Sequence, residues 1–274
     1  MANELIRLRK RKKSESQIEK LSNNAEHTLV VHYSCESFYD IKDGKTPRIT
    51  SIAIRGLDGE QTESFSIHKI AEKEHVLPTD IPSKYDELEK EMLSEYFEYM
   101  RQHQKYTFVH WNMRDINYGF IAIEHRYQVL GGDPYKVPDD NKFNLAKAMS
   151  ALYGNDYIGH GDKGRFLNLL KFNDITDKDA LGGEEEALAF KSAEYIKLHQ
   201  STLRKVDCMT CVFSRVAEDS LKTNASWTDR HGMHPKIIID YIREHWLYSL
   251  VGMGLTVFGI IKLYQWSSTQ GITP

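Results

Sequence analysis

Three acidic positions in the sequence accompany segments that are expected to form regular structure. Glu36 follows one largely apolar run, Asp115 follows a second, and three consecutive glutamates occupy positions 184–186. Strand ends in one sheet can bring distant carboxylates within a few ångströms, where they repel one another unless a hard cation such as Mg²⁺ or Mn²⁺ neutralises them. Two such ions, about 3.5–4 Å apart, promote attack of water on a phosphodiester. Metal-dependent hydrolysis of nucleic acid is therefore the chemistry that these residues suggest.

Each candidate also has a purely structural interpretation. Glu36 could face water at a strand end, and Asp115 would be favoured by the dipole of a helix N-terminus. A glutamate run such as that at 184–186 often begins a solvated helix. His110, five residues before Asp115, could act as a general base or pack as a buried histidine. The sequence leaves these alternatives open.

A basic run lies near the N-terminus. Its members are Arg7, Arg9, Lys10, Arg11, Lys12 and Lys13. The run could bind anionic lipid or phosphate, with each charge contributing about 1 kcal/mol near a membrane surface. It could equally form a solvated helix. The net charge of −3 and the pI near 6.5 argue against a protein that coats nucleic acid through its net charge, so any basic surface must be local.

The composition indicates a folded protein from a reducing compartment. Of the 274 residues, 41% are apolar and 27% are charged, which suffices for a core. Three cysteines are too few for a disulfide framework, and the N-terminus does not resemble a signal peptide. Cys208 and Cys211 lack the second pair that a zinc site would need, and the carboxylate beside Cys35 disfavours a thiolate nucleophile. Known phosphate-loop, dinucleotide and hydrolase motifs are absent from the sequence.

The spacing of apolar and turn residues predicts an α/β fold. Strands are expected over 29–33, 49–57 and 62–70 as an antiparallel meander, followed by a helix of about five turns after Ser83. A fourth strand over 106–111 leads into a helix over 115–130. Further helices are expected over 145–153 and 164–172, and a longer helical stretch with one break over 184–221.

A hydrophobic segment near the C-terminus predicts a transmembrane helix. Residues 247–261 carry no charge, and Trp246 and Trp266 would lie about 30 Å apart in a helix, which matches the hydrocarbon thickness of a bilayer. Lys262 could snorkel to the headgroups. The distribution of basic residues predicts a single-pass protein with its large N-terminal domain in the cytoplasm. A buried core helix is the alternative. Glycines in the segment could let copies associate as a homo-oligomer.

The order of these elements and motifs resembles the DEDD 3′–5′ exonuclease superfamily, the DnaQ-like branch of the ribonuclease H-like fold. The likeness covers residues 29–190. Ser34-Cys35-Glu36 stands at the family's first motif, His110 and Asp115 have the spacing of the second, and residues 179–187, with Glu186, resemble the third. The resemblance implies a mixed sheet, with antiparallel strands 1–3 plus parallel strands, flanked by helices. It also implies that Glu36, Asp115 and Glu186 hold Mg or Mn, with His110 beside them.

Three departures from the family pattern affect the expected function. Ser34 replaces the leading Asp, Trp111 replaces an Asn, and the usual His before the third carboxylate is missing. Loss of a carboxylate weakens a metal site. The sequence therefore predicts a membrane-anchored, exonuclease-like protein with an atypical site that binds nucleic acid or a partner protein at the inner membrane face. The alternative is an active Mg/Mn-dependent nuclease for DNA or RNA. By resemblance alone, either the binding protein or the active nuclease could take part in defence against injected phage DNA.

The expected domain organisation has five parts. They are a basic N-terminal helix or arm (1–27), an exonuclease-like domain (28–221), a linker (222–236), a transmembrane helix with a juxtamembrane turn (237–266) and a tail (267–274).

Overall fold

The computed structural model describes residues 4–36, 46–59, 61–114, 116–226, 250, 252–262 and 265–266. Asp115 lies outside the described residues. So do the second part of the predicted linker, the first part of the predicted transmembrane helix and the whole tail. The predictions for those segments remain predictions.

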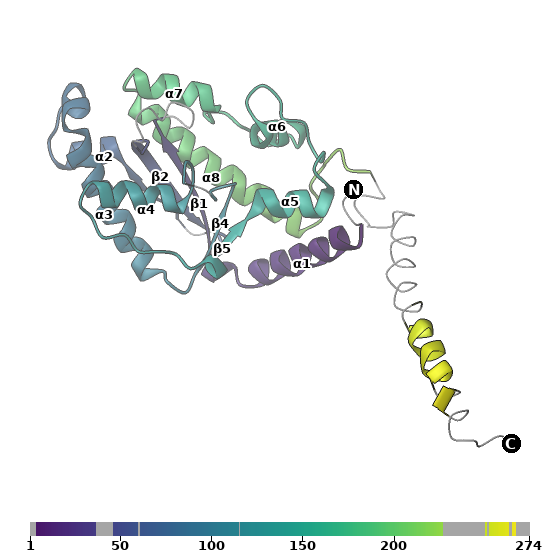
Figure 1. Ribbon diagram of the computed structural model, residues 1–274. Coiled ribbons are helices and arrows are strands. Elements are labelled where there is room, and N and C mark those ends of the chain that lie inside the picture. The colour runs from purple at the N-terminus through teal and green to yellow at the C-terminus, as the bar shows by residue number, and fades with distance from the viewer. Residues whose placement is uncertain are drawn as a thin grey trace.

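A five-stranded mixed sheet in the order β3-β2-β1-β4-β5 forms the centre of the domain (Figure 1). Its strands are β1 (Thr28–Cys35), β2 (Ile49–Gly56), β3 (Glu63–Ser66), β4 (Thr107–His110) and β5 (Lys142–Asn144). The pairs β1–β2 and β2–β3 are antiparallel, whereas the pairs β1–β4 and β4–β5 are parallel. β1, β4 and β5 therefore end at one edge of the sheet. This confirms an α/β fold with a mixed sheet.

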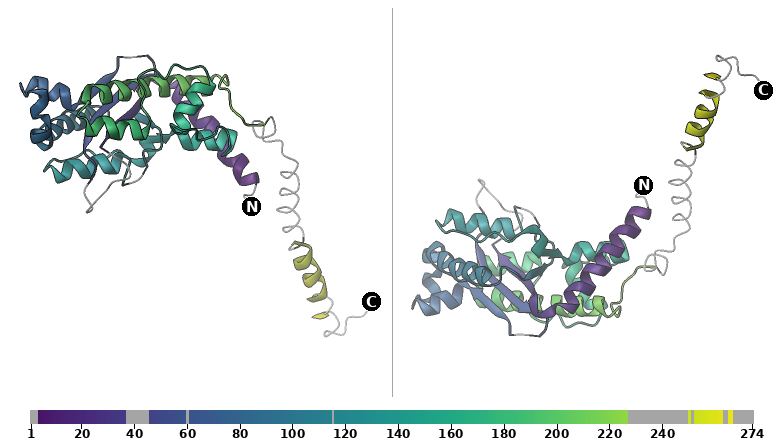
Figure 2. Two further views of the ribbon diagram at one scale, coloured as in Figure 1. Left: turned by 90° about the horizontal axis from the view of Figure 1, so that it is seen from above. Right: turned by 90° about the horizontal axis from the view of Figure 1, so that it is seen from below.

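Helices cover both faces of the sheet (Figures 1 and 2). They are α1 (Glu4–Asn23), α2 (Ile67–Lys73), α3 (Tyr85–Gln102), α4 (Phe120–Val129), α5 (Leu145–Tyr153), α6 (Arg165–Phe172), α7 (Gly183–Lys191) and α8 (Tyr195–Ala217). Short 3₁₀ helices at Ala25–His27, Pro78–Lys84 and Asp139–Asn141 connect other elements. Because side chains alternate along a strand, Val31 and Tyr33 pack toward α3 and α4, while Val30 packs toward α1, α5 and α8.

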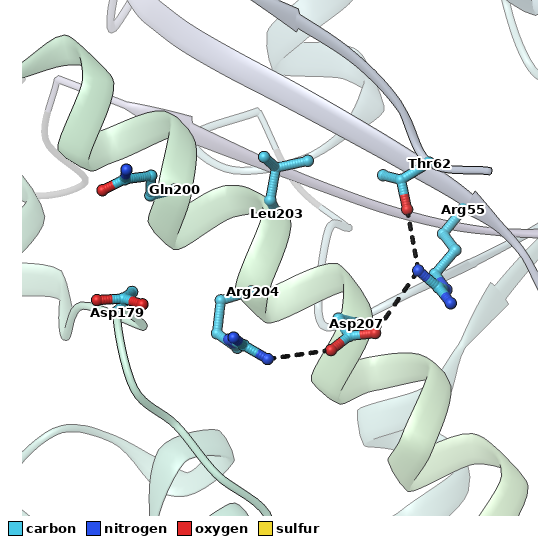
Figure 3. A pocket seen from close by; sticks show the side chains of 7 residues that line it. All are labelled: Arg55, Thr62, Asp179, Gln200, Leu203, Arg204 and Asp207. Atoms are coloured by element: carbon cyan, nitrogen blue, oxygen red, sulfur yellow. Dashed lines mark hydrogen bonds and ion pairs between the residues drawn. The ribbon is translucent and has the colours of Figure 1, made fainter.

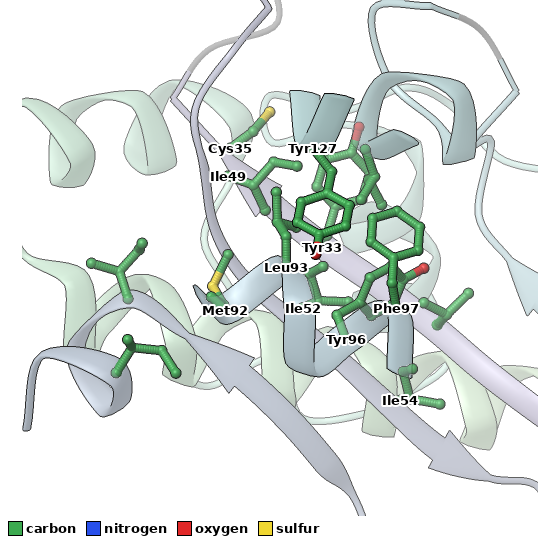
Figure 4. Close-up of a cluster of buried hydrophobic side chains, with 14 of the residues drawn as sticks. Tyr33, Cys35, Ile49, Ile52, Ile54, Met92, Leu93, Tyr96, Phe97 and Tyr127 are labelled. Atoms are coloured by element: carbon green, nitrogen blue, oxygen red, sulfur yellow. The ribbon is translucent and has the colours of Figure 1, made fainter. Parts of the chain in front are cut away.

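The core on the α3 and α4 side is rich in aromatic residues (Figure 4). Tyr96 and Phe97 of α3 meet edge to face, and Phe97 stacks on Tyr127 of α4. Ile52 and Tyr33 from the sheet complete the contact and are fully buried. Burial of each such side chain contributes about 1.5–3 kcal/mol, so this layer holds β1 rigidly in place.

Several predicted elements are confirmed closely. α5 occupies the predicted residues 145–153 and is followed by Gly154, whose φ of 86° suits glycine at a helix end. The predicted break in the stretch 184–221 falls between α7 and α8, where Ala193 has a φ of 54°.

Two predictions were wrong in detail, and one strand was missed. β3 ends at Ser66, and residues 67–70, expected as strand, begin α2 because Ile67, Ile70 and Ala71 are buried at helical spacing. The helix expected from about 115 begins at Phe120. β5 was not predicted, since three residues are too few to show a strand period.

The C-terminal segment is described only in part. Within the described residues, no helix combines the length and the apolar character needed to cross a membrane. The continuous helical run there is 252–262. The transmembrane part of the fold prediction is therefore not confirmed.

Candidate functional site

The candidate site lies at the C-terminal end of β1, on the face that α8 covers. His32 and Ser34 are two residues apart and therefore point to the same face of the sheet. α7 packs against both α8 and β1 and brings Glu186 to this place. The candidate site is thus built from β1, α7 and α8, with Ser34 on β1 and Glu186 on α7.

Glu186 is paired with a lysine rather than exposed to solvent. The residue is 2% exposed. The ammonium of Lys205 donates to Glu186 Oε1 at 2.7 Å, and the hydroxyl of Ser201 donates to the same oxygen at 3.0 Å. Ser201 and Lys205 are four residues apart on α8 and so lie on one face of that helix. A built-in cation therefore neutralises this buried carboxylate.

Among the described residues, two polar atoms on the α8-covered face of β1 have no hydrogen-bond partner. They are His32 Nε2 and Ser34 Oγ, both buried. The hydroxyl of Tyr118 lies 3.1 Å from His32 Nδ1 and donates to the carbonyl of Tyr33 at 3.3 Å. Because Nδ1 contacts Tyr118, Nε2 is the ring nitrogen of His32 that is left without a partner. Unpartnered buried polar atoms are rare in folded proteins because each costs about 1–3 kcal/mol.

His32 is held in its neutral form. Burial lowers the pKa of its imidazole well below the usual 6.5, and the nearby ammonium of Lys205 lowers this pKa further. A neutral imidazole with a free ring nitrogen can accept a proton or a hydrogen bond. The α8-covered face of the sheet therefore carries one unpartnered ring nitrogen, one unpartnered hydroxyl and one ammonium.

Glu36 lies just beyond the end of β1. Its backbone N–H donates to the carbonyl of Arg48 at 2.8 Å, and the Arg48 N–H approaches Glu36 Oε2 at 3.5 Å. The side chain is half-buried. The guanidinium of Arg48 also lies 5.0 Å from the centre of the Tyr85 ring. Glu36 is thus held beside a cationic residue at the sheet edge.

His110 is a buried residue at the end of β4. Its Nδ1 accepts the backbone N–H of Met113 at 3.0 Å, and its ring meets Phe120 edge to face. Burial, with a smaller effect of the Lys142 ammonium, lowers the pKa of His110 to about 4. The described contacts of His110 match the structural interpretation that the sequence had left open.

The described residues contain no group of three or more His, Cys, Asp and Glu side chains that could hold a metal ion. Of the predicted ligands, Glu36 and Glu186 are described and Asp115 is not. Sequence analysis missed Lys205, Ser201 and His32. The i to i+4 spacing of Ser201 and Lys205 and the alternation of His32 with Ser34 were the available signals, but neither indicates a contact with Glu186.

The basic run of the N-terminus forms part of α1. Arg9, Lys10, Lys12 and Lys13 are exposed, whereas Arg7 and Arg11 are half-buried. Arg11 pairs with Glu15 at 2.7 Å within the helix. Ile18 and Leu21 of the same helix belong to the core with α5 and α8. α1 is therefore packed against the domain along its second half.

A separate open pocket of about 390 Å³ lies on the outer side of α8 (Figure 3). Arg55 and Arg204 share the carboxylate of Asp207, at 3.6 and 3.2 Å. Arg55 also donates to Thr62. The charges of this pocket are largely paired within the protein, and it does not include the site at the end of β1.

Comparison of the chain with known protein families, curated proteins and solved structures returned no significant match. What the site does must therefore be inferred from its geometry and from the sequence motifs.

Proposed function

We propose that this chain carries a ribonuclease H-like domain of the DEDD exonuclease type, whose atypical site binds nucleic acid without hydrolysing it, and whose C-terminal segment holds it at a membrane. The strand order β3-β2-β1-β4-β5 supports this assignment. Three antiparallel strands followed by two parallel ones are the arrangement that the sequence resemblance implies.

The observation that carries the proposal is the pair between Glu186 and Lys205. The resemblance assigns Glu186 to a metal, yet an ammonium lies 2.7 Å from its Oε1. A divalent ion bound there would have to displace Lys205 or tolerate its repulsion. Ser34, where the family has a carboxylate, removes a further negative charge. Both changes weaken cation binding, and both favour an anionic ligand such as a phosphodiester.

The membrane part of the proposal rests on exposed apolar side chains. Met253, Leu255, Phe258 and Ile260 are each more than half exposed. The sequence around them is uncharged from 247 to 261. Such a surface requires an apolar environment for burial, and a lipid bilayer provides one.

Binding and turnover should be measured on the full chain in detergent micelles. A fluorescent single-stranded oligonucleotide should bind with an affinity that falls as salt rises, and it should stay intact with Mg²⁺ or Mn²⁺. Lys205→Gln should weaken binding, whereas Lys191→Gln, an exposed change on α7, should not. Absence of binding by the parent chain would sink the proposal.

The same variant tests the role of the ammonium directly. Without Lys205, Glu186 should accept a divalent ion, so Mn²⁺ should raise the melting temperature of Lys205→Gln but not of the parent. At a hundred times the dissociation constant the gain is about 2.7 kcal/mol. The double variant Lys205→Gln/Glu186→Gln is the control and should show no gain. Stabilisation of the parent by Mn²⁺ would contradict the proposed role of Lys205.

The alternative, an active nuclease, is favoured by the free ring nitrogen of His32 and the free hydroxyl of Ser34. These atoms could orient a water or a metal-bound oxygen if Glu36 and Asp115 supplied the carboxylates. Metal-dependent shortening of the oligonucleotide that is lost in Glu36→Gln would establish this alternative.

A further inference from the structure

The outward face of α1 is a preformed row of lysines. Ser14, Ile18 and Leu21 are buried and define the inner side of this helix. At about 100° of rotation per residue, Lys13 and Lys20 project from α1 in nearly the same direction, whereas Lys10 and Lys12 project to opposite sides of that line. All four lysines are exposed. From Lys10 to Lys20 the row extends about 15 Å at 1.5 Å per residue.

Packing of α1 fixes the direction of this lysine row. The helix contacts α5 and α8, and its apolar residues join the core beneath them. A basic segment with a free backbone would lose conformational entropy when it met a surface. The lysine row of a packed helix has already lost most of that freedom, so it can meet a flat anionic surface as one unit.

The start of α1 and the point from which the chain continues to the apolar segment lie at one end of the domain. Arg7 Nη2 lies 3.7 Å from the position that a Cβ on Gly154 would take. Three residues further along, the carbonyl of Tyr157 accepts the backbone N–H of Asn224 at 2.8 Å. The loop after α5 therefore lies next to Arg7 of α1 and is hydrogen-bonded to Asn224, close to the last described residues of the domain.

We propose that Lys13 and Lys20, with Lys10 and Lys12 extending on either side of them, rest on anionic lipid headgroups of the same membrane that takes up the apolar C-terminal segment. This inference rests on the membrane part of the proposed function. A membrane partner is favoured over nucleic acid because the lysine row and the path to the apolar segment share one end of the domain. A basic face and an apolar anchor act together on anionic bilayers. The contact would set the orientation of the domain, and with it the direction in which the site at the end of β1 faces.

Lysine acetylation of the full chain in lipid nanodiscs, read by mass spectrometry, tests the contact. In discs that contain phosphatidylglycerol, the four lysines of α1 should be acetylated several-fold more slowly than in discs of phosphatidylcholine alone. Lys90, Lys105 and Lys191, exposed on other elements, serve as internal controls and should react equally in both. Equal rates for the α1 lysines in the two kinds of disc would overturn the inference.

Two variants and one added ligand separate the remaining outcomes. In Lys10→Glu/Lys12→Glu/Lys13→Glu, the protection of Lys20 should disappear, whereas Lys90→Glu/Lys105→Glu/Lys191→Glu should keep it. Persistent protection in the first variant would count against lipid contact. Protection of the row by single-stranded DNA in uncharged discs, without protection by phosphatidylglycerol, would assign the row to nucleic acid instead. A chain that enters neither kind of disc would defeat the membrane part of the proposed function itself.

Discussion

Two buried ion pairs lie on opposite faces of the sheet and differ in how completely they are hydrogen-bonded. Glu89 of α3 faces Arg126 of α4 and is fully buried. Arg126 Nε donates to both of its oxygens at 3.0 Å, Nη2 donates to Oε2 at 2.6 Å, and the backbone N–H of Ile49 donates to Oε1 at 2.7 Å. Asp86 accepts from the same guanidinium at 2.7 Å. Both oxygens of Glu89 are occupied.

The pair of Glu186 and Lys205 is equally buried but stands beside free polar atoms. The bonds from Ser201 and Lys205 reach a single oxygen, Oε1, and within the described part of the chain His32 Nε2 and Ser34 Oγ on the same face have no partner. A buried polar network in which every group is hydrogen-bonded makes a core more rigid. A network with unpaired groups lowers the stability of the fold. The difference teaches that burial and charge do not by themselves mark a functional site. The second pair differs from the first in having unused hydrogen-bonding capacity on the same face of the sheet.

The largest expected effect comes from breaking the saturated pair. Arg126→Met should lower the free energy of unfolding by about 3–5 kcal/mol, because Glu89 would remain buried without its cation. Lys205→Met should cost less, since Lys205 makes one bond to its carboxylate where Arg126 makes three. Urea unfolding of both variants gives the comparison. Equal losses would remove the distinction between a structural and a functional pair.

Acid should destabilise the domain through its neutral histidines. The pKa of His110 is about 4 in the folded protein, below the unfolded value near 6.5. The unfolded state therefore binds the proton first, so stability that is present above pH 6.5 is lost as the pH falls toward 4. A difference of this size corresponds to about 3 kcal/mol.

The variant His110→Asn isolates the contribution of His110 to the loss of stability in acid. The amide oxygen can still accept the N–H of Met113, as His110 Nδ1 does at 3.0 Å, but it does not titrate. Unfolding at pH 7 and at pH 4.5 should show a smaller loss for this variant than for the parent. The same loss in both proteins would mean that the acid sensitivity arises elsewhere, for example at His199, whose pKa burial also lowers to about 4.

The sheet and most helices could be predicted because their signals are local. The apolar run before Ser34 gave β1, and Gly154 marked the end of α5. The start of α2 could not be separated from β3, because Ile67 and Ile70 fit the end of an alternating run as well as a helical turn. In such short segments, packing against α3 decides between strand and helix.

The candidate site was predictable only in outline. The order of the motifs along the sequence was enough to indicate Ser34, Glu36 and Glu186 as candidates. The pairing of Glu186 with Lys205 depends on how α7 packs against α8, and nineteen residues separate the two in sequence. Neither residue carries a local pattern that indicates the other. The contact between the Glu186 carboxylate and the Lys205 ammonium is therefore visible only in the tertiary structure.

The smallest effect, and the most direct check on the unsaturated site, comes from two serines that pair across neighbouring strands. Ser34 of β1 and Ser51 of β2 are opposite in register and both fully buried. Ser51 Oγ lies 2.7 Å from Thr202 Oγ1, which itself donates to the carbonyl of Leu198, so Ser51 is the donor. Ser51→Ala should therefore cost about 1 kcal/mol, whereas Ser34→Ala, which removes a hydroxyl without a partner, should be neutral or slightly stabilising. Because the two sites share depth, strand pairing and residue type, urea unfolding of the two variants measures hydrogen-bond satisfaction alone. A loss for Ser34→Ala as large as that for Ser51→Ala would show that the Ser34 hydroxyl is already satisfied, and the site at the end of β1 would then lose its unused capacity for a ligand.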